Sequence, residues 1–67
     1  MQVLKITDIY NSVYYLNTAY IKGYTYNKNT DMTIIFAPEE TEYYVKGDVT
    51  ASITQAITGN IKAIGLR

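Results

Sequence analysis

The residues with the clearest capacity for chemistry are tyrosines and a lysine that alternate along one short stretch. Four side chains are spaced by two residues and would share one face of a strand: Tyr20, Lys22, Tyr24 and Tyr26. Tyrosine rings can stack on nucleotide bases while a neighbouring lysine binds phosphate. The spacing predicts a surface for a small anionic, nucleotide-like ligand. The alternative is that these tyrosines lie in the core or in a subunit interface, where tyrosine is enriched.

The predicted ligand-binding set combines stacking rings, cations for phosphate and hydroxyls at the start of a helix. Its members are Tyr14, Tyr24 and Tyr26 for stacking, Lys22, Lys46 and Arg67 for phosphate, and Thr50 and Ser52 for hydrogen bonds. Either Tyr14 or Tyr44 would complete the aromatic surface by pairing across from the strand. At the helix start, ordinary capping by Asp48 or Thr50 is the alternative to an anion site.

The composition argues against catalysis by an acid–base pair or by a metal ion. The chain has no cysteine and no histidine, so thiolate and imidazole ligands, nucleophiles and bases are all missing. Glu39, Glu40 and Glu42 cluster around Pro38, which predicts a solvated turn. No phosphate-binding glycine motif and no nucleophile motif is present. We therefore expect no catalytic residue, no metal site and no cofactor.

Charge and hydropathy narrow the partners further. Six basic residues balance six acidic ones, which disfavours long nucleic acid as a partner. No apolar run approaches the roughly 20 residues of a membrane span, and the start lacks the pattern of a signal peptide. These features predict no membrane partner and a cytoplasmic location, which would be the host cytoplasm for a viral protein.

The length of 67 residues predicts one domain, 1–67, with a thin core. Small domains are usually stabilised by disulfides, a metal or a partner copy, and only the partner copy is compatible with this composition. The sequence therefore predicts a homo-oligomer.

Hydrophobic periodicity predicts a small α+β fold, with an antiparallel sheet or open barrel of five to six strands and one C-terminal helix. The expected strands are 3–8, 13–16, 20–26, 32–37 and 41–46. The nearly continuous apolar stretch 32–37 suits a central strand covered on both faces. Beyond Gly47, helical spacing predicts a helix of about ten residues that stops at Gly59–Asn60. The apolar segment 61–66 is expected to form a sixth strand or an arm that packs on a neighbouring copy.

The order of elements from Leu16 to Ile57 resembles the FlbD-like family of small bacterial flagellar and motility proteins. The similar stretches are Leu16–Asn17, the hairpin 20–36, and 41–46 leading into the helix at Val49. The start departs from that family, because Thr7 to Asn11 stands where the family carries an Arg-Leu-Asn-Gly-like turn. The resemblance implies a protein-interaction module with the tyrosines as its contact surface.

The overall profile is also similar to that of small, compact phage proteins that sequester the nucleotide signals of bacterial anti-phage defence. The chain is short, cysteine-free and rich in tyrosine, with eight of them. Our leading expectation is a non-enzymatic homo-oligomer that sequesters a small anionic nucleotide-type ligand. The alternatives are the FlbD-like interaction module and, third, a nucleotide-processing enzyme that works without histidine or metal.

Overall fold

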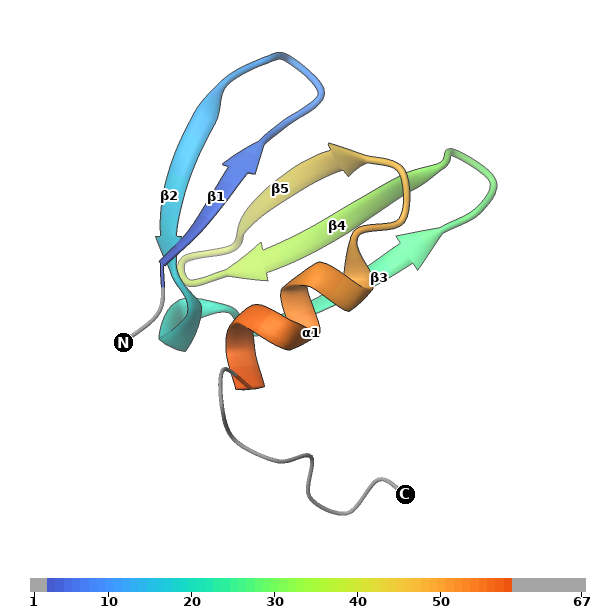
Figure 1. The fold of residues 1–67 in the computed structure, drawn as a ribbon. Helices are drawn as coiled ribbons and strands as arrows, with labels where there is room; N and C mark the ends of the chain where they lie inside the picture. The colour runs from blue at the N-terminus through green and yellow to red at the C-terminus, as the bar shows by residue number, and fades with distance from the viewer. Residues whose placement is uncertain (1–2, 59–67) are drawn as a thin grey trace.

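The computed structural model describes residues 3–58 and shows a small α+β fold (Figure 1). In this part of the chain, five antiparallel strands form two sheets, and one helix follows them. The elements are β1 (Val3–Thr7), β2 (Val13–Asn17), the 3-10 helix η1 (Thr18–Tyr20), β3 (Gly23–Asn27), β4 (Met32–Ala37), β5 (Thr41–Lys46) and α1 (Thr50–Thr58). The α+β class and the helix after the strands are confirmed. The predicted stop at Gly59–Asn60, the segment 61–66 and Arg67 lie outside the described residues.

The strands divide into a two-stranded sheet and a three-stranded sheet, in place of the predicted single sheet or barrel. β1 pairs with β2, and β4 lies between β3 and β5. The loop between β1 and β2 meets the larger sheet through one backbone hydrogen bond, which the N–H of Ile9 donates to the carbonyl of Tyr44 over 2.9 Å. β1 and β2 form a hairpin, which we call the hairpin from here on. It is joined to β5 at its loop and not along a ladder of hydrogen bonds.

A small core lies between the hairpin, the larger sheet and α1. Ile6, Leu16, Ile35 and Ile53 are its buried members, one from each of β1, β2, β4 and α1. Because α1 covers the same sheet face as the hairpin, only alternate residues of β4 are buried: Thr33, Ile35 and Ala37. Met32, Ile34 and Phe36 point to the other face and are half-buried. The prediction of a central strand is confirmed, because β4 lies between β3 and β5, but only one of its faces is buried and not both.

The third strand begins later than predicted, because the chain first makes a turn of 3-10 helix. The side chain of Asn17 accepts a hydrogen bond from the N–H of Ala19, and the N–H of Ile21 closes the turn on the carbonyl of Thr18. Pairing with β4 starts at the N–H of Lys22, which donates to Phe36. Of the four residues predicted to share a strand face, only Tyr24 and Tyr26 lie on β3, because Tyr20 ends η1 and Lys22 comes just before the strand.

The helix carries its apolar residues at helical spacing, as the sequence predicts. Val49 and Ile53 face the core, and the N–H of Ile53 donates to the carbonyl of Val49 in the first turn. Within the described residues, no helix has the length and apolar character that a membrane crossing requires.

Candidate functional site

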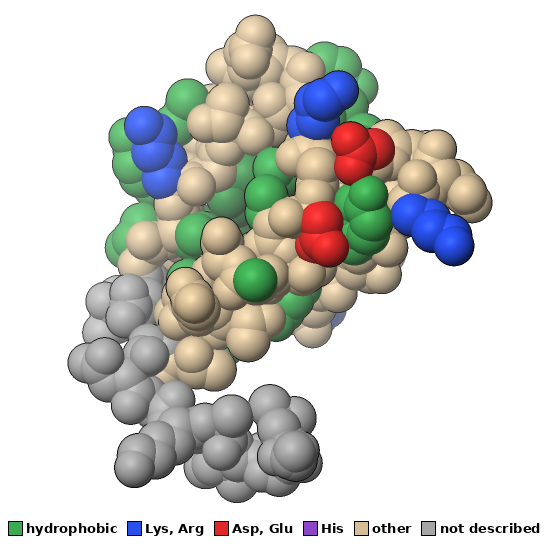
Figure 2. Space-filling model, turned by 45° about the vertical axis from the view of Figure 1, so that its right-hand side comes forward, with side chains coloured by type: hydrophobic (Ala, Val, Ile, Leu, Met, Phe, Trp, Pro, Cys, Tyr) green, Lys and Arg blue, Asp and Glu red, His purple; other side chains and the backbone are tan. Residues whose placement is uncertain are grey.

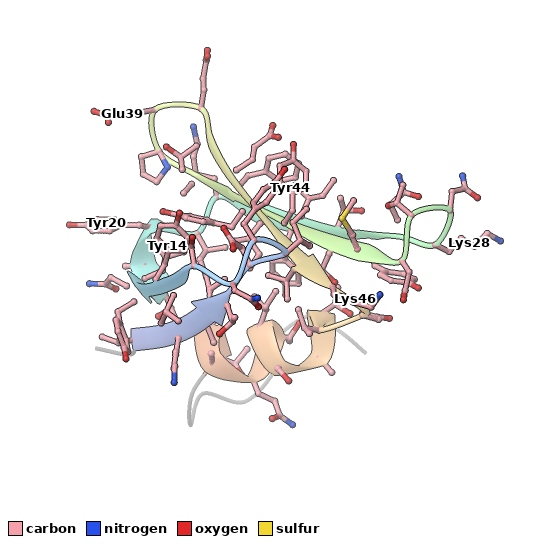
Figure 3. The ribbon with its side chains drawn as sticks, turned by 90° about the horizontal axis from the view of Figure 1, so that it is seen from above. Tyr14, Tyr20, Lys28, Glu39, Tyr44 and Lys46 are labelled. Atoms are coloured by element: carbon pink, nitrogen blue, oxygen red, sulfur yellow. The ribbon has the colours of Figure 1, made fainter. Side chains whose placement is uncertain are left out.

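The structure does not bring together in one chain those predicted ligand-binding residues that fall within 3–58. Tyr14 lies on β2, whereas Lys46 ends β5, and Figure 3 shows the two residues apart from each other. Lys22 borders a shallow depression beside the turn between β4 and β5, where Glu40 and Glu42 are its neighbours. Carboxylates next to this lysine make the depression a poor site for an anion.

Two of the predicted stacking rings are tied into the fold. Tyr24 packs against the core and shares a hydrogen bond with the hydroxyl of Thr54 on α1. Tyr26 donates to the carboxylate of Asp31 over 2.8 Å. This hydrogen bond, followed by desolvation and by the charges of Asp31 and Asp48, raises the pKa of Tyr26 above its ordinary value. Tyr24 and Tyr26 therefore hold β3 to the helix and to the following turn.

The start of α1 is capped by the chain itself. The carboxylate of Asp48 accepts hydrogen bonds from the N–H and the hydroxyl of Thr50, at 3.1 and 2.7 Å. These bonds lower the pKa of Asp48, against the opposing effect of desolvation. The carboxylate of Asp48 already occupies the position that a phosphate would take. Thr50 therefore takes part in the capping of the helix by Asp48, which is the alternative to an anion site. Ser52 is exposed and lines a cleft described below.

Tyr14 and Tyr44 occupy different surroundings. The ring of Tyr14 packs on that of Tyr43, with centroids 4.9 Å apart and planes tilted by 55°, and so connects the hairpin to β5. Tyr44 lies opposite Ile34, on the other face of the sheet from Tyr24. Its hydroxyl donates to Glu42, and this hydrogen bond is the main cause that raises the pKa of Tyr44.

An exposed aromatic ring beside a cation does exist, on residues that the sequence analysis did not select. In the hairpin, Lys5 lies directly opposite Tyr15, which is 70% exposed. The alternation along β1 and β2 places both on the outer side of the hairpin, a surface that we call the hairpin face. Its members are Val3, Lys5, Thr7, Val13, Tyr15 and Asn17. The sequence does contain a signal for this face in Lys5, because a lysine between Leu4 and Ile6 marks the side of β1 that faces solvent.

Exposed apolar side chains are concentrated in the first third of the chain. Of the eight large apolar side chains that are exposed among the described residues, seven belong to the hairpin, its loop and η1: Val3, Ile9, Tyr10, Val13, Tyr14, Tyr15 and Tyr20. Charged side chains of both signs are interspersed on the face in Figure 2 and form no single charged patch there. Clustered exposed apolar side chains mark surfaces that contact a partner.

A cleft of about 240 Å³ lies between β1 and α1. Its walls include the side chains of Ile35, Val45, Val49 and Ile53, and its rim includes Ser52. Four consecutive residues of β1, Leu4 to Thr7, also line it. Consecutive side chains of a strand point to opposite faces, so all four can meet the cleft only along the backbone edge of β1.

Among the described residues, no group of three or more acidic, histidine or cysteine side chains could hold a metal ion.

Comparisons of this chain with protein-family models, with curated proteins and with solved structures find no match.

Proposed function

We propose that this chain is a non-enzymatic, self-associating interaction module, as in the FlbD-like alternative, and that the hairpin face is its contact surface. The observation that carries the proposal is the concentration of exposed apolar side chains on the hairpin and its surroundings, with Tyr15 at 70% and Val3 at 59% exposure. Tyrosine is enriched at protein interfaces because its ring buries a large area at a small entropy loss.

The thinness of the hairpin supports the same proposal. A two-stranded sheet is marginally stable by itself in water, and three or more strands or a packed face are needed. In this chain the inner side of the hairpin packs on the core through Ile6 and Leu16, whereas Val3, Val13 and Tyr15 on the outer side have no covering element among the described residues. A second copy seated on the hairpin face would bury these side chains and strengthen the sheet.

Solution mass tests the proposal. We expect the wild-type chain to be a dimer or larger, measured by light scattering over a range of concentrations. Val13→Glu places a charge at the loop end of the hairpin face and should weaken association at least about tenfold, since burying an unpaired charge is unfavourable. Thr25→Glu is the control, because Thr25 is exposed on the other sheet. A wild-type chain that stays monomeric at every concentration contradicts the proposal.

The second candidate is the sequestration of a small anionic, nucleotide-type ligand, as in phage proteins that counter bacterial defence, acting in the cytoplasm. The pairing of Lys5 with Tyr15 favours it, because a ring beside a cation suits a base and its phosphate. Lys5 and Tyr15 lie on an exposed face, so a ligand bound between them would be enclosed if two hairpin faces met. Self-association is thus common to both candidates.

Thermal shift against cyclic and ADP-ribose-type nucleotides tests the second candidate. A ligand at a hundred times its Kd stabilises the fold by about 2.7 kcal/mol. Lys5→Ala should abolish the shift, whereas Lys28→Ala should keep it, because Lys28 lies at the far end of the β3–β4 hairpin (Figure 3). The absence of a shift with every nucleotide contradicts sequestration. A bound nucleotide recovered chemically changed would indicate the nucleotide-processing enzyme instead.

A further inference from the structure

The cleft between β1 and α1 combines an apolar floor with an unpaired strand edge. Ile35 and Ile53, which line the cleft, are each 1% exposed, so its apolar floor is part of the core. Among the described residues, β1 pairs with β2 alone. The backbone groups on its other edge, from Leu4 to Thr7, therefore border the cleft without a ladder partner. An edge of this kind next to apolar pockets is the arrangement that binds an extended segment by strand addition.

The chain itself contains a segment whose sequence fits this cleft. Nine residues follow Thr58, and their letters read Gly59-Asn60-Ile61-Lys62-Ala63-Ile64-Gly65-Leu66-Arg67. In an extended conformation Lys62, Ile64 and Leu66 share one side, with the two apolar residues at its C-terminal end, and Ile61, Ala63 and Gly65 share the other. The six residues 61–66 span about 20 Å when extended, which exceeds the about 17 Å of the five-residue edge of β1.

We propose that the segment 61–66 of a second copy binds in this cleft, along the free edge of β1. This inference rests on the self-association proposed above and names the contact that completes it. The cleft and the hairpin face meet along β1, because Lys5 and Thr7 belong to both. A neighbouring copy seated at β1 covers the two surfaces together, whereas a chain's own segment would cover the cleft alone. Exchange in both directions gives a closed dimer with two-fold symmetry.

Disulfide trapping tests the inference, because the natural chain has no cysteine. Ser52→Cys places a thiol at the rim of the cleft, and Ile64→Cys places one on the bound segment. In a chain with both substitutions, mild oxidation should give a covalent dimer on a non-reducing gel. The matched control combines Gln55→Cys with Ile64→Cys, since Gln55 is exposed on α1 and does not line the cleft. We expect at least about fivefold less dimer from the control.

The outcomes separate this inference from the proposed function. A covalent dimer specific to the Ser52 pair supports the exchange. A cross-linked monomer means that each chain fills its own cleft, and it overturns the exchange. Equal or absent cross-linking in the two variants overturns the docking itself. Light scattering on the unsubstituted chain is read independently: a dimer there leaves the hairpin-face proposal intact even when trapping fails, and a monomer contradicts both.

A second pair of variants checks the apolar character of the contact in the full chain. Ile64→Asp should weaken dimerisation at least about tenfold, because it puts a charge on the side that faces the cleft. Ala63→Asp adds the same charge one residue away, on the other side of an extended segment, and should have a smaller effect. Equal effects of the two substitutions contradict the docked, extended segment.

Discussion

At the scale of single residues, the threonine in the middle of the sheet organises the start of the helix. Thr33 is fully buried, and its hydroxyl donates to the carbonyl of Gly47 over 2.7 Å. The same oxygen accepts a hydrogen bond from the N–H of Val49 over 3.1 Å. One hydroxyl thus satisfies two backbone groups at the point where the chain leaves β5 and enters α1. Neither role is visible in the sequence, where Thr33 reads as one more strand residue.

We predict that Thr33→Val destabilises the fold although the two side chains have nearly the same shape. The substitution leaves the partly buried carbonyl of Gly47 and N–H of Val49 without this partner, and a polar group that loses its hydrogen bond away from water is unfavourable. The expected loss in the free energy of unfolding is about 2 kcal/mol, measured by urea denaturation. Thr25→Val, at an exposed position of β3, should change it by less than about 0.5 kcal/mol. Equal values for the two variants would show that the hydroxyl of Thr33 is dispensable.

At the scale of elements, the turn between β4 and β5 has a backbone that its residues do not favour. Glu39 and Glu40 both have positive φ, at 62° and 59°. This left-handed conformation suits asparagine and glycine and is unfavourable for glutamate by about 1 kcal/mol or more per residue. Figure 3 shows Glu39 pointing away from the sheet at the tip of this turn. The turn is therefore a place where the fold can be made more stable without touching a proposed contact.

Glu40→Gly is expected to raise the free energy of unfolding by about 1 kcal/mol, because glycine adopts the positive φ without a steric penalty. In a domain of this size that gain corresponds to a melting temperature about 4–8 °C higher, read by circular dichroism. Glu40→Gln removes the same charge and keeps the unfavourable backbone, so it should give no such gain. A similar rise in both variants would assign the effect to charge instead of φ.

The elements themselves were largely predictable, and the way they pack was not. Alternation located the strands and helical spacing located α1, because both patterns depend on neighbours in the sequence. The apolar stretch 32–37 was misread, since its half-buried side is indistinguishable in composition from its buried side. Tyr20 was assigned to a strand because the capping of η1 by Asn17 carries no periodic signal.

The ligand-binding residues stay a prediction, but the structure changes which tyrosines are exposed beside a lysine. This combination was expected along 20–26, and in the structure Lys5 lies opposite the exposed Tyr15 in the hairpin. The tyrosines of β3 satisfy their hydroxyls within the fold, through Thr54 and Asp31. Which tyrosines turn inward depends on the side of the sheet that the helix covers, and the position of the helix is a long-range property.

At the scale of the whole molecule, folding and association should be coupled. The buried apolar residues among those described are few: Ile6, Leu16, Ile35, Ala37 and Ile53. Such a core gives a modest margin of stability, so burial between copies would contribute a large part of it. An associating protein gains stability with concentration because only the folded chains bind one another.

We therefore predict that the melting temperature of the wild-type chain rises with protein concentration. For a dimer, a tenfold increase adds about 1.4 kcal/mol per dimer, which corresponds to about 5 °C for two chains of this length. Scanning calorimetry at about 10 and 100 μM measures the shift. Val13→Glu should melt at a lower temperature than the wild-type chain at each concentration, because its association is weakened while its core is unchanged. A wild-type melting temperature that is constant over this range would mean that the small core stabilises the single chain unaided.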